Sequence, residues 1–231
     1  MKVTIVTGAS SGIGKEITKK LLSLNYKVIG VSRSIKQDDF KDKNFTPLQA
    51  DLSNETSTLL ACEYLKKENA HMLINCAGFG RFEPHEELSQ KTIIEMICVN
   101  LTAPILLTNA LLRDLKNNNG YLININSIEA LRASKFAAVY SATKAGLKAF
   151  GDSLFEETRK SGLSITNINP DMTQSSFYDE LRFETSAKDD EKLLCEDIAN
   201  TVEHVISMRK GAVVSDYTIR SLKFGIVKKK L

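Results

Sequence analysis

The fold is decided by the stretch VTIVTGASSGIG, which occupies residues 3–14. Its first five residues are apolar or β-branched and predict a buried strand. Glycines follow at positions 8, 12 and 14, and the next segment places Ile13, Ile17, Leu21 and Leu22 on one helical face. The sequence therefore predicts a strand, a tight glycine turn and a helix in direct succession.

The glycine loop predicts a binding site for an anion. Glycine lacks a Cβ, so a ligand can approach the backbone closely, and the positive end of the helix dipole faces the same space. A diphosphate fits this field, and we expect it to be cradled by Gly8, Ser10, Ser11, Gly12, Ile13 and Gly14. The spacing G-x-x-x-G-x-G differs from the common dinucleotide fingerprint G-x-G-x-x-G. A glycine-rich surface turn before an ordinary helix is the alternative.

Composition indicates one α/β domain over residues 1–231, with 42% hydrophobic and 26% charged residues. The net charge of +3 is too small to favour nucleic acid as a partner. The four cysteines form no C-x-x-C pair, and the three histidines lack the spacing of metal ligands. We expect no apolar run long enough to span a bilayer and no signal peptide. These features favour a cytoplasmic protein without metal, membrane or nucleic acid.

Strand and helix patterns alternate along the rest of the chain. Strands are expected at 26–32, 45–50, 72–75, 121–127, 163–169 and 212–222. Helices are expected at 53–68 with Ser53 as N-cap, at 88–115 with Pro104 as a kink or a new start, at 137–160 and at 193–208. This alternation predicts a doubly wound parallel β-sheet with helices on both faces. Ligands of such sheets bind at the carboxyl ends of the strands.

Two segments fall outside this alternation. Residues 172–190 are polar, without clean periodicity, and follow a strand's carboxyl end, so we interpret them as a substrate lid. The run Lys228-Lys229-Lys230 is expected to be a solvated tail, with a membrane-surface patch as the alternative.

The end of the second strand carries Ser32, Arg33 and Ser34. In a dinucleotide fold this position meets the adenosine ribose, where an acidic side chain would bind the free 2′-hydroxyl. A small hydroxyl followed by a guanidinium suits a 2′-phosphate instead, because arginine offers a bidentate donor fork. The sequence therefore favours NADP(H), with NAD(H) still possible. The alternative is that Arg33 is a solvated loop charge.

Tyr140 and Lys144 lie one helical turn apart and can face one site. A nearby ammonium favours the phenolate, so we expect a lowered tyrosine pKa and acid-base chemistry near neutrality. A half-buried tyrosine beside a surface lysine is the alternative. Ser127 follows the fifth strand and could polarise a carbonyl, or it could simply cap a turn. Asn100 is an amide in an apolar run that needs partners; it orients Lys144 through a water or is purely structural.

Together these residues resemble the short-chain dehydrogenase/reductase family in its compact single-domain form. The matching features, in chain order, are Thr7-Gly8-x-x-x-Gly12-Ile13-Gly14, Asn75-Cys76-Ala77-Gly78, Asn100, Ser127, Tyr140-x-x-x-Lys144 and Asn169-Pro170. The resemblance runs from about Lys2 to Met208 and implies a Rossmann-like fold.

The resemblance also implies a catalytic tetrad of Asn100, Ser127, Tyr140 and Lys144. Tyr140 would exchange a proton with the substrate oxygen held by Ser127, Lys144 would bind the nicotinamide ribose, and Asn100 would anchor a water. Further cofactor contacts implied by the family are Ser32, Arg33, Asp51, Leu52, Asn75, Ala77, Gly78, Tyr140, Lys144, Pro170 and Ser175.

The chain departs from the family pattern at three places. Cys76 replaces an asparagine, and Asp171 replaces a glycine and adds a negative charge beside the expected nicotinamide position. The C-terminus lacks the usual Asp-Gly-Gly and ends in a basic tail, which leaves the expected homodimer or homotetramer without its usual C-terminal packing motif.

The sequence thus predicts an NADP(H)-dependent oxidoreductase that interconverts a carbonyl and a secondary alcohol. The alternative is a non-catalytic NADP(H)-binding regulator or scaffold. An epimerase or dehydratase acting on nucleotide sugars needs a larger substrate domain than the residues past Asn169 supply. An apolar substrate pocket is one interpretation of Phe79, Phe82, Phe177, Tyr178 and Phe183; core or dimer contacts are the others.

Overall fold

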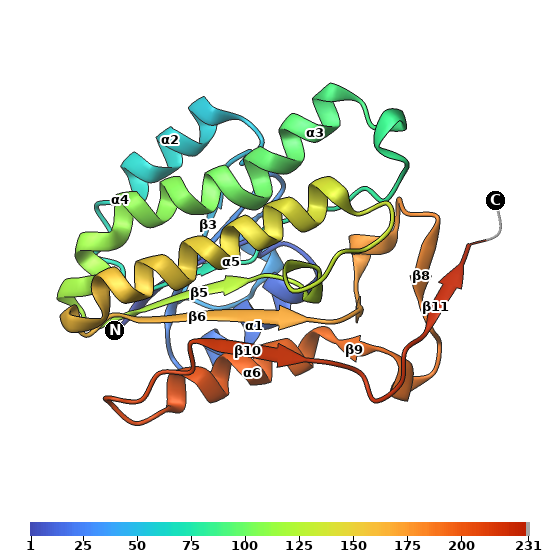
Figure 1. Cartoon of the computed structure of the whole chain (residues 1–231). Coiled ribbons are helices and arrows are strands. Elements are labelled where there is room, and N and C mark those ends of the chain that lie inside the picture. The colour runs from blue at the N-terminus through green and yellow to red at the C-terminus, as the bar shows by residue number, and fades with distance from the viewer. Residues whose placement is uncertain (230–231) are drawn as a thin grey trace.

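A computed structural model describes residues 1–229 and contains a seven-stranded parallel sheet of order β10-β6-β5-β4-β1-β2-β3 (Figure 1). The strands are β1 (Val3–Thr7), β2 (Lys27–Ser32), β3 (Phe45–Gln49), β4 (Met72–Asn75), β5 (Tyr121–Ile125), β6 (Ser164–Pro170) and β10 (Asp216–Ile219). Chain order reverses on the two sides of β1, which pairs with both β2 and β4. The predicted doubly wound sheet is confirmed, and this reversal opens the crevice where ligands bind.

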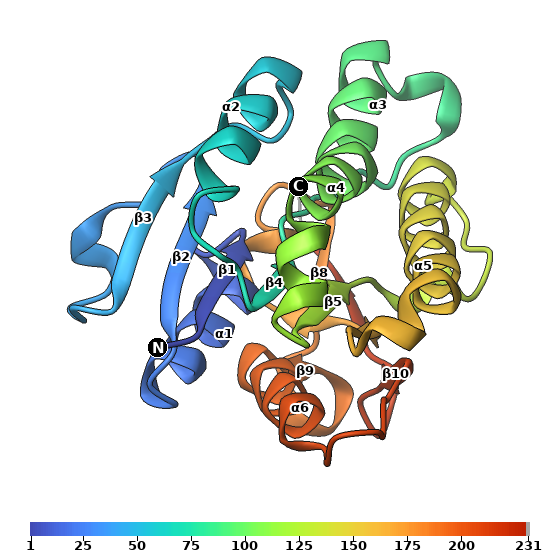
Figure 2. The same ribbon diagram turned by 90° about the vertical axis from the view of Figure 1, so that its left-hand side faces the viewer.

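Helices cover both faces of the sheet (Figure 2). One face packs against α1 (Gly12–Ser23) and α6 (Cys195–Ser207), with Ile17 and Ile198 in its core. The other packs against α2 (Glu55–Leu65), α4 (Ala103–Asn117) and α5 (Ala138–Thr158), with Leu107 and Leu154 in its core. Two buried layers of this kind stabilise a sheet whose strands are apolar on both sides.

The long apolar segment predicted at 88–115 forms three consecutive helical pieces. α3 (Gln90–Ile97) passes through the π-helical turn η3 (Cys98–Thr102) into α4, where Pro104 occupies the first turn. The backbone stays helical at Thr102 and Ala103, so Pro104 does not start a separate helix; the change of winding lies in the preceding turn η3. By length and composition Gln90–Asn117 could cross a membrane, because its most apolar 18-residue window has a mean hydropathy of 1.6, so the expectation that no run is long enough is wrong. A core helix passes the same test, and α4 buries Leu107, Leu111 and Leu115.

Two helix starts differ from the sequence prediction. The N-cap of α2 is Asn54, whose side chain accepts from Ser57 N at 2.9 Å, and not Ser53. The Ser53 hydroxyl is already engaged, because it donates to Asp51 Oδ1 at 2.7 Å. α6 begins at Cys195 because Leu193–Leu194 forms the short strand β9, paired with β7 (Thr173–Gln174).

The predicted lid, residues 172–190, has structure of its own. It contains β7, the 3-10 turns η6 (Ser176–Tyr178) and η7 (Asp189–Glu191), and strand β8 (Phe183–Thr185). β8 pairs antiparallel with β11 (Ile226–Lys228) from the C-terminus. The expected long last strand is only four residues, since β10 lies at the sheet edge and pairs solely with the end of β6.

The tail is exposed as its charge suggested, but it is also bonded to the rest of the chain. Lys228 belongs to β11, and Lys229 Nζ donates to the carbonyl oxygens of Tyr178 at 2.5 Å and Asp179 at 3.0 Å. Lys229 N also donates to Arg182 O at 2.9 Å. The basic tail therefore rests on the lid; Lys230 lies outside the described residues.

Candidate active site

A groove of about 730 Å³ opens at the carboxyl ends of the strands. The loop between β1 and α1 forms the floor of the groove. The glycines of this loop stand where a side chain would collide with the neighbouring backbone, and they leave room for a bound diphosphate. A Cβ on Gly14 would lie 2.3 Å from Gly8 O, and a Cβ on Gly8 would lie 2.9 Å from Ala77 Cα. Gly8 also has φ +71°, which side chains rarely adopt. Only glycine permits this close packing, which leaves backbone N–H groups facing the groove.

Most of the residues expected to bind the cofactor line this groove. They come from four strand ends and the lid, and comprise Gly8, Ser10, Ser11, Gly12, Ile13, Gly14, Ser32, Arg33, Asp51, Leu52, Ala77, Gly78 and Ser175. Thr7 holds two of these strand ends together, because its hydroxyl accepts from Cys76 N at 2.9 Å and Ala77 N at 3.0 Å. An extended dinucleotide would fit along this line of residues.

Asn75 and Pro170 are placed elsewhere. The buried Asn75 amide donates to Asn124 Oδ1 at 3.0 Å on β5, so this residue joins two strands and does not line the groove. Pro170 ends β6 and pairs with Ile219. Neither residue lines the groove, and their contact with a cofactor stays a prediction.

One end of the groove carries Ser32, Arg33 and Asp51. Hydrogen bonds from Ser53 hold the pKa of Asp51 below its usual range, and Arg33 lowers it further. Arg33 is exposed and has no carboxylate partner among residues 1–229. Its guanidinium is therefore available to an anionic group in the groove, as the NADP(H) hypothesis requires.

Tyr140 lies at the first turn of α5 under a cluster of aromatic rings. Phe82 and Phe177 pack on it with ring centroids at 5.2 and 5.8 Å, and only 6% of the residue is exposed. Burial raises the tyrosine pKa, the neighbouring Ser127 lowers it and Glu129 raises it further. The net shift is upward, so the expected lowering of this pKa by Lys144 is wrong here.

Lys144 is buried beside Tyr140, with Nζ 5.9 Å from the centre of the tyrosine ring. Nζ donates to Ile125 O at 2.9 Å, at the carboxyl end of β5. Burial lowers the pKa of Lys144 to about 8, with a small opposing effect of Cys76. The pair is thus close, as the spacing predicted, although the ammonium bonds a carbonyl and its charge is partly suppressed by burial.

Ser127 and Asn100 complete the group. The Ser127 hydroxyl accepts from Glu129 N at 3.2 Å, so it caps the 3-10 turn η4 (Ile128–Ala130) and also neighbours Tyr140. The fully buried Asn100 sits in η3, where Oδ1 accepts from Phe79 N at 3.1 Å and Nδ2 donates to Phe79 O at 2.9 Å. Both residues therefore have the structural partners that one alternative expected, and their catalytic roles stay predictions.

Gly78 lies between the groove and the four expected catalytic residues. It lines the groove, and a Cβ built on it would lie 3.2 Å from Asn100 Oδ1 and 3.4 Å from Lys144 Nζ. Phe177 also lines the groove while its ring contacts Tyr140. The four expected catalytic residues therefore lie beside the inner end of the groove.

Comparison with known proteins identifies the family. A model of the short chain dehydrogenases matches residues 2–185. The chain belongs to the short-chain dehydrogenase family. Dehydrogenase/reductase SDR family member 11 of Gallus gallus is 30% identical over 243 residues, which cover 95% of each chain.

Solved structures of the family agree with the fold. A 4-hydroxyisoleucine dehydrogenase complexed with NADH has a TM-score of 0.80 at 26% identity, covering 96% of this chain and 97% of that one. A metagenomic short-chain oxidoreductase in complex with NADP has a TM-score of 0.79 at 25% identity, covering 95% and 96%. The predicted family and fold are confirmed, and this protein is a short-chain NAD(P)(H)-dependent dehydrogenase/reductase.

The departure at Asp171 is accommodated in this dehydrogenase. The Asp171 carboxylate accepts a hydrogen bond from Met172 N at 2.8 Å, and the backbone N–H of Asp171 donates to Ile219 O at 2.9 Å. Asp171 does not line the groove. Ser175 Oγ caps η6 by accepting from Phe177 N at 3.4 Å. The Asp171 carboxylate thus bonds the neighbouring backbone.

Several contacts at the site carry no local sequence signal. Arg81 and Glu180 form an ion pair at the rim of the groove although 99 positions separate them. Thr143 accepts from Asn100 Nδ2 at 3.2 Å. Phe82, Phe177, Tyr178 and Phe183 pack in one cluster with Tyr140, whereas Phe79 contributes its backbone. Aromatic composition pointed to this cluster, but only the fold shows which rings meet.

Proposed function

We propose that this dehydrogenase interconverts a carbonyl and a secondary alcohol with NADP(H), and that Tyr140 is its general acid and base. The observation that carries the proposal is that Tyr140 lies beside Ser127 and Lys144, next to the groove residues Phe177 and Gly78. Because its pKa is raised, Tyr140 holds its proton at neutral pH. A reduced carbonyl oxygen needs such a proton.

The residues around Tyr140 would position the substrate and the cofactor. A bound nicotinamide supplies or accepts a hydride at its C4 atom. Ser127 would hold the substrate oxygen within reach of the Tyr140 hydroxyl. Lys144 uses one N–H on Ile125 O and keeps its other donors for a cofactor hydroxyl. Asn100 fixes the Phe79 backbone and thereby the shape of the inner groove.

The aromatic cluster supports an apolar substrate group. Phe82 packs on Tyr140 and contacts both Phe177 and Phe183, with Phe82–Phe183 centroids at 5.3 Å. These rings exclude water from the reacting atoms, which strengthens the electrostatic interactions there. A small ketone with an apolar substituent fits this setting.

The proposal is tested with Tyr140→Phe, which removes the proton donor and keeps the ring. We expect NADPH oxidation over a panel of ketones, aldehydes, keto acids and quinones to fall at least about 100-fold, while the NADPH dissociation constant changes little. Tyr64→Phe, on the exposed face of α2, is the matched control. Retained turnover in the Tyr140 variant would contradict the assigned role, and NADPH binding without turnover by the wild type would favour the regulator.

The NADP(H) preference rests on Arg33 and Ser32 at the ribose end of the groove. Replacing Arg33 with Ser removes the guanidinium, so we expect NADPH binding to weaken about tenfold and NADH binding to change little. Arg113→Ser, which changes an exposed side chain on α4, is the control. Tighter binding of NADH than of NADPH by the wild type would overturn the preference. A cytoplasmic location stays a prediction.

A further inference from the structure

A second pocket of about 560 Å³ lies at the amino ends of the strands, opposite the cofactor groove at their carboxyl ends. The two share no lining residue. It is formed where strands begin: Lys2 precedes β1, His71 precedes β4, and Tyr121 and Ser164 start β5 and β6. The connection from α6 to β10 closes its other side. None of these residues has a part in the proposed reaction.

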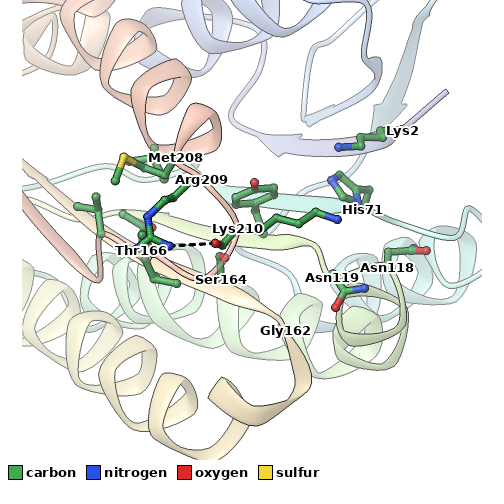
Figure 3. Close-up of a pocket in the computed structure, with 16 residues that line it drawn as sticks. Lys2, His71, Asn118, Asn119, Gly162, Ser164, Thr166, Met208, Arg209 and Lys210 are labelled. Atoms are coloured by element: carbon green, nitrogen blue, oxygen red, sulfur yellow. Dashed lines mark hydrogen bonds between the residues drawn. The ribbon is translucent and has the colours of Figure 1, made fainter.

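The charges around this pocket are all of one sign. Lys2, Arg209 and Lys210 line it, and no aspartate or glutamate does. None of the three cations forms an ion pair within residues 1–229. Figure 3 shows Lys2 and His71 at one end, Arg209 at the other and the Lys210 chain extending between them. Three uncompensated cations around one concavity produce a field that favours an anion.

The floor of the pocket carries polar atoms that lack partners in the described chain. His71 Nε2 and Thr166 Oγ1 are both buried without a hydrogen bond. Burial, with a contribution from Lys2, lowers the pKa of His71 to about 4, so the ring is neutral near pH 7. Buried polar groups are normally paired, and a ligand with hydrogen-bonding oxygens would provide partners after small side-chain rotations.

The remaining wall of the pocket is apolar. Val205, Met208, Val213 and Val214 face the space beside the cations. A pocket with a cationic end and an apolar wall suits a molecule that has an anionic head and an organic body. Inorganic phosphate alone would leave the apolar wall unused.

We propose that this pocket binds a small organic phosphate, with Lys2 and Lys210 at its phosphate group and the valines of the α6–β10 connection against its organic part, while Arg209 adds positive charge from the other end. Phosphate oxygens accept from several donors at once, and arginine and lysine are the side chains that provide them. The ligand would therefore bind about as far from Tyr140 as the sheet allows, at the amino ends of the same strands.

Binding is measured by titrating the full chain with phenyl phosphate and with inorganic phosphate while the imidazole NMR signals are followed. The protein has three histidines, so a His71→Gln variant assigns the His71 signal. We expect saturable shifts of this signal, with phenyl phosphate binding about tenfold more tightly because its ring covers apolar surface. Equal affinity for the two probes would overturn the organic part of the proposal.

Charge variants locate the anion. Lys210→Gln and Lys2→Gln should each weaken phenyl phosphate binding about tenfold, the loss of one charged hydrogen bond. Lys91→Gln removes the same charge from an 85% exposed side chain on α3 and should leave the affinity unchanged. No saturable shift at His71, or equal losses in all three variants, would overturn the proposal. Arg33→Gln shows whether phosphate in the cofactor groove contributes, and it should leave the His71 shift intact.

Discussion

At the scale of single residues, burial has a larger effect than the neighbouring charge on the ionisation of the catalytic candidates. The sequence places Tyr140 and Lys144 one turn apart, and from that spacing alone a lowered tyrosine pKa is the reasonable expectation. In the folded chain the rings of Phe82 and Phe177 close off the tyrosine, and its pKa rises. Desolvation depends on residues about 40 to 60 positions away along the chain, so local spacing cannot predict it.

The buried lysine gives stability a specific pH dependence. Between pH 8 and 10.5 the folded protein has lost the Lys144 proton and the unfolded chain still holds it. The unfolded state then binds more protons, so the free energy of unfolding rises with pH across this window. The shift from 10.5 to about 8 corresponds to roughly 3 kcal/mol. Urea denaturation between pH 7.5 and 9 should show this rise, because above pH 9 the Cys76 and Cys195 thiols, whose pKa burial raises, act in the opposite direction.

Two variants isolate the contribution of Lys144. Lys144→Met should abolish the rise in unfolding free energy, because the titrating group is gone. Lys148, one turn further along α5, has a raised pKa: hydrogen bonds to Asp152 and Asp216 outweigh its partial burial. Lys148→Met should therefore keep the rise. A rise that persists in the Lys144 variant would show that another group causes it.

At the scale of elements, buried asparagines connect the middle strands. Asn75 on β4 donates to Asn124 Oδ1 on β5 at 3.0 Å, and Asn124 donates to Asn167 Oδ1 on β6 at 3.2 Å. Asn167 Nδ2 continues to Asp152 on α5 at 2.8 Å. The family motif identified Asn75, but its strand-joining role appears only when three strands are aligned in register.

Removing the hydrogen bonds between these buried asparagines should lower the free energy of unfolding. Asn124→Leu preserves the side-chain size but removes both bonds, and leaves polar atoms of Asn75 and Asn167 short of partners. We expect a loss of about 2 to 3 kcal/mol in unfolding free energy, measured by urea denaturation. Asn200→Leu, exposed on α6, should change it by less than about 0.5 kcal/mol. An Asn124 variant with an unchanged free energy of unfolding would show that these asparagine hydrogen bonds do not contribute to stability.

The C-terminal tail should slow the opening of the lid. Lys229→Ala removes the bonds to the Tyr178 and Asp179 carbonyls, so we expect amides in residues 176–185 to exchange with deuterium about fivefold faster. Lys228→Ala is a matched control, because its side chain is exposed beside the same strand. Identical exchange in wild type and the Lys229 variant would mean that the tail merely rests on the lid.

At the scale of the whole molecule, much of the architecture was predictable. The glycine loop, the alternation of elements and the motif order gave the parallel sheet and the site at its carboxyl edge, because each depends on local patterning. The pairing of β11 with β8 and the Arg81–Glu180 bridge join segments about 40 and 99 positions apart. Contacts of this range leave no periodic signal in the sequence.

Association of copies is the remaining expectation at this scale. The apolar Gln90–Asn117 segment is only one-third buried over its most apolar window, and Ile94 is 60% exposed on α3. We expect light scattering to give the mass of a dimer or tetramer, and Ile94→Asp to lower it. Leu60→Asp, at a similarly exposed position on α2, should not. A monomeric wild type would contradict this expectation.

The π-helical turn η3 has a consequence for how related sequences are read. It accommodates one residue more than an α-helical turn, and this surplus directs Asn100 toward Phe79 and Thr143. Deleting a single neighbour such as Val99 would restore regular winding and swing the asparagine by about 100° around the axis. A homologue that lacks one residue at this place would retain every family motif in its sequence. Its asparagine side chain would nevertheless point away from the positions of Phe79 and Thr143.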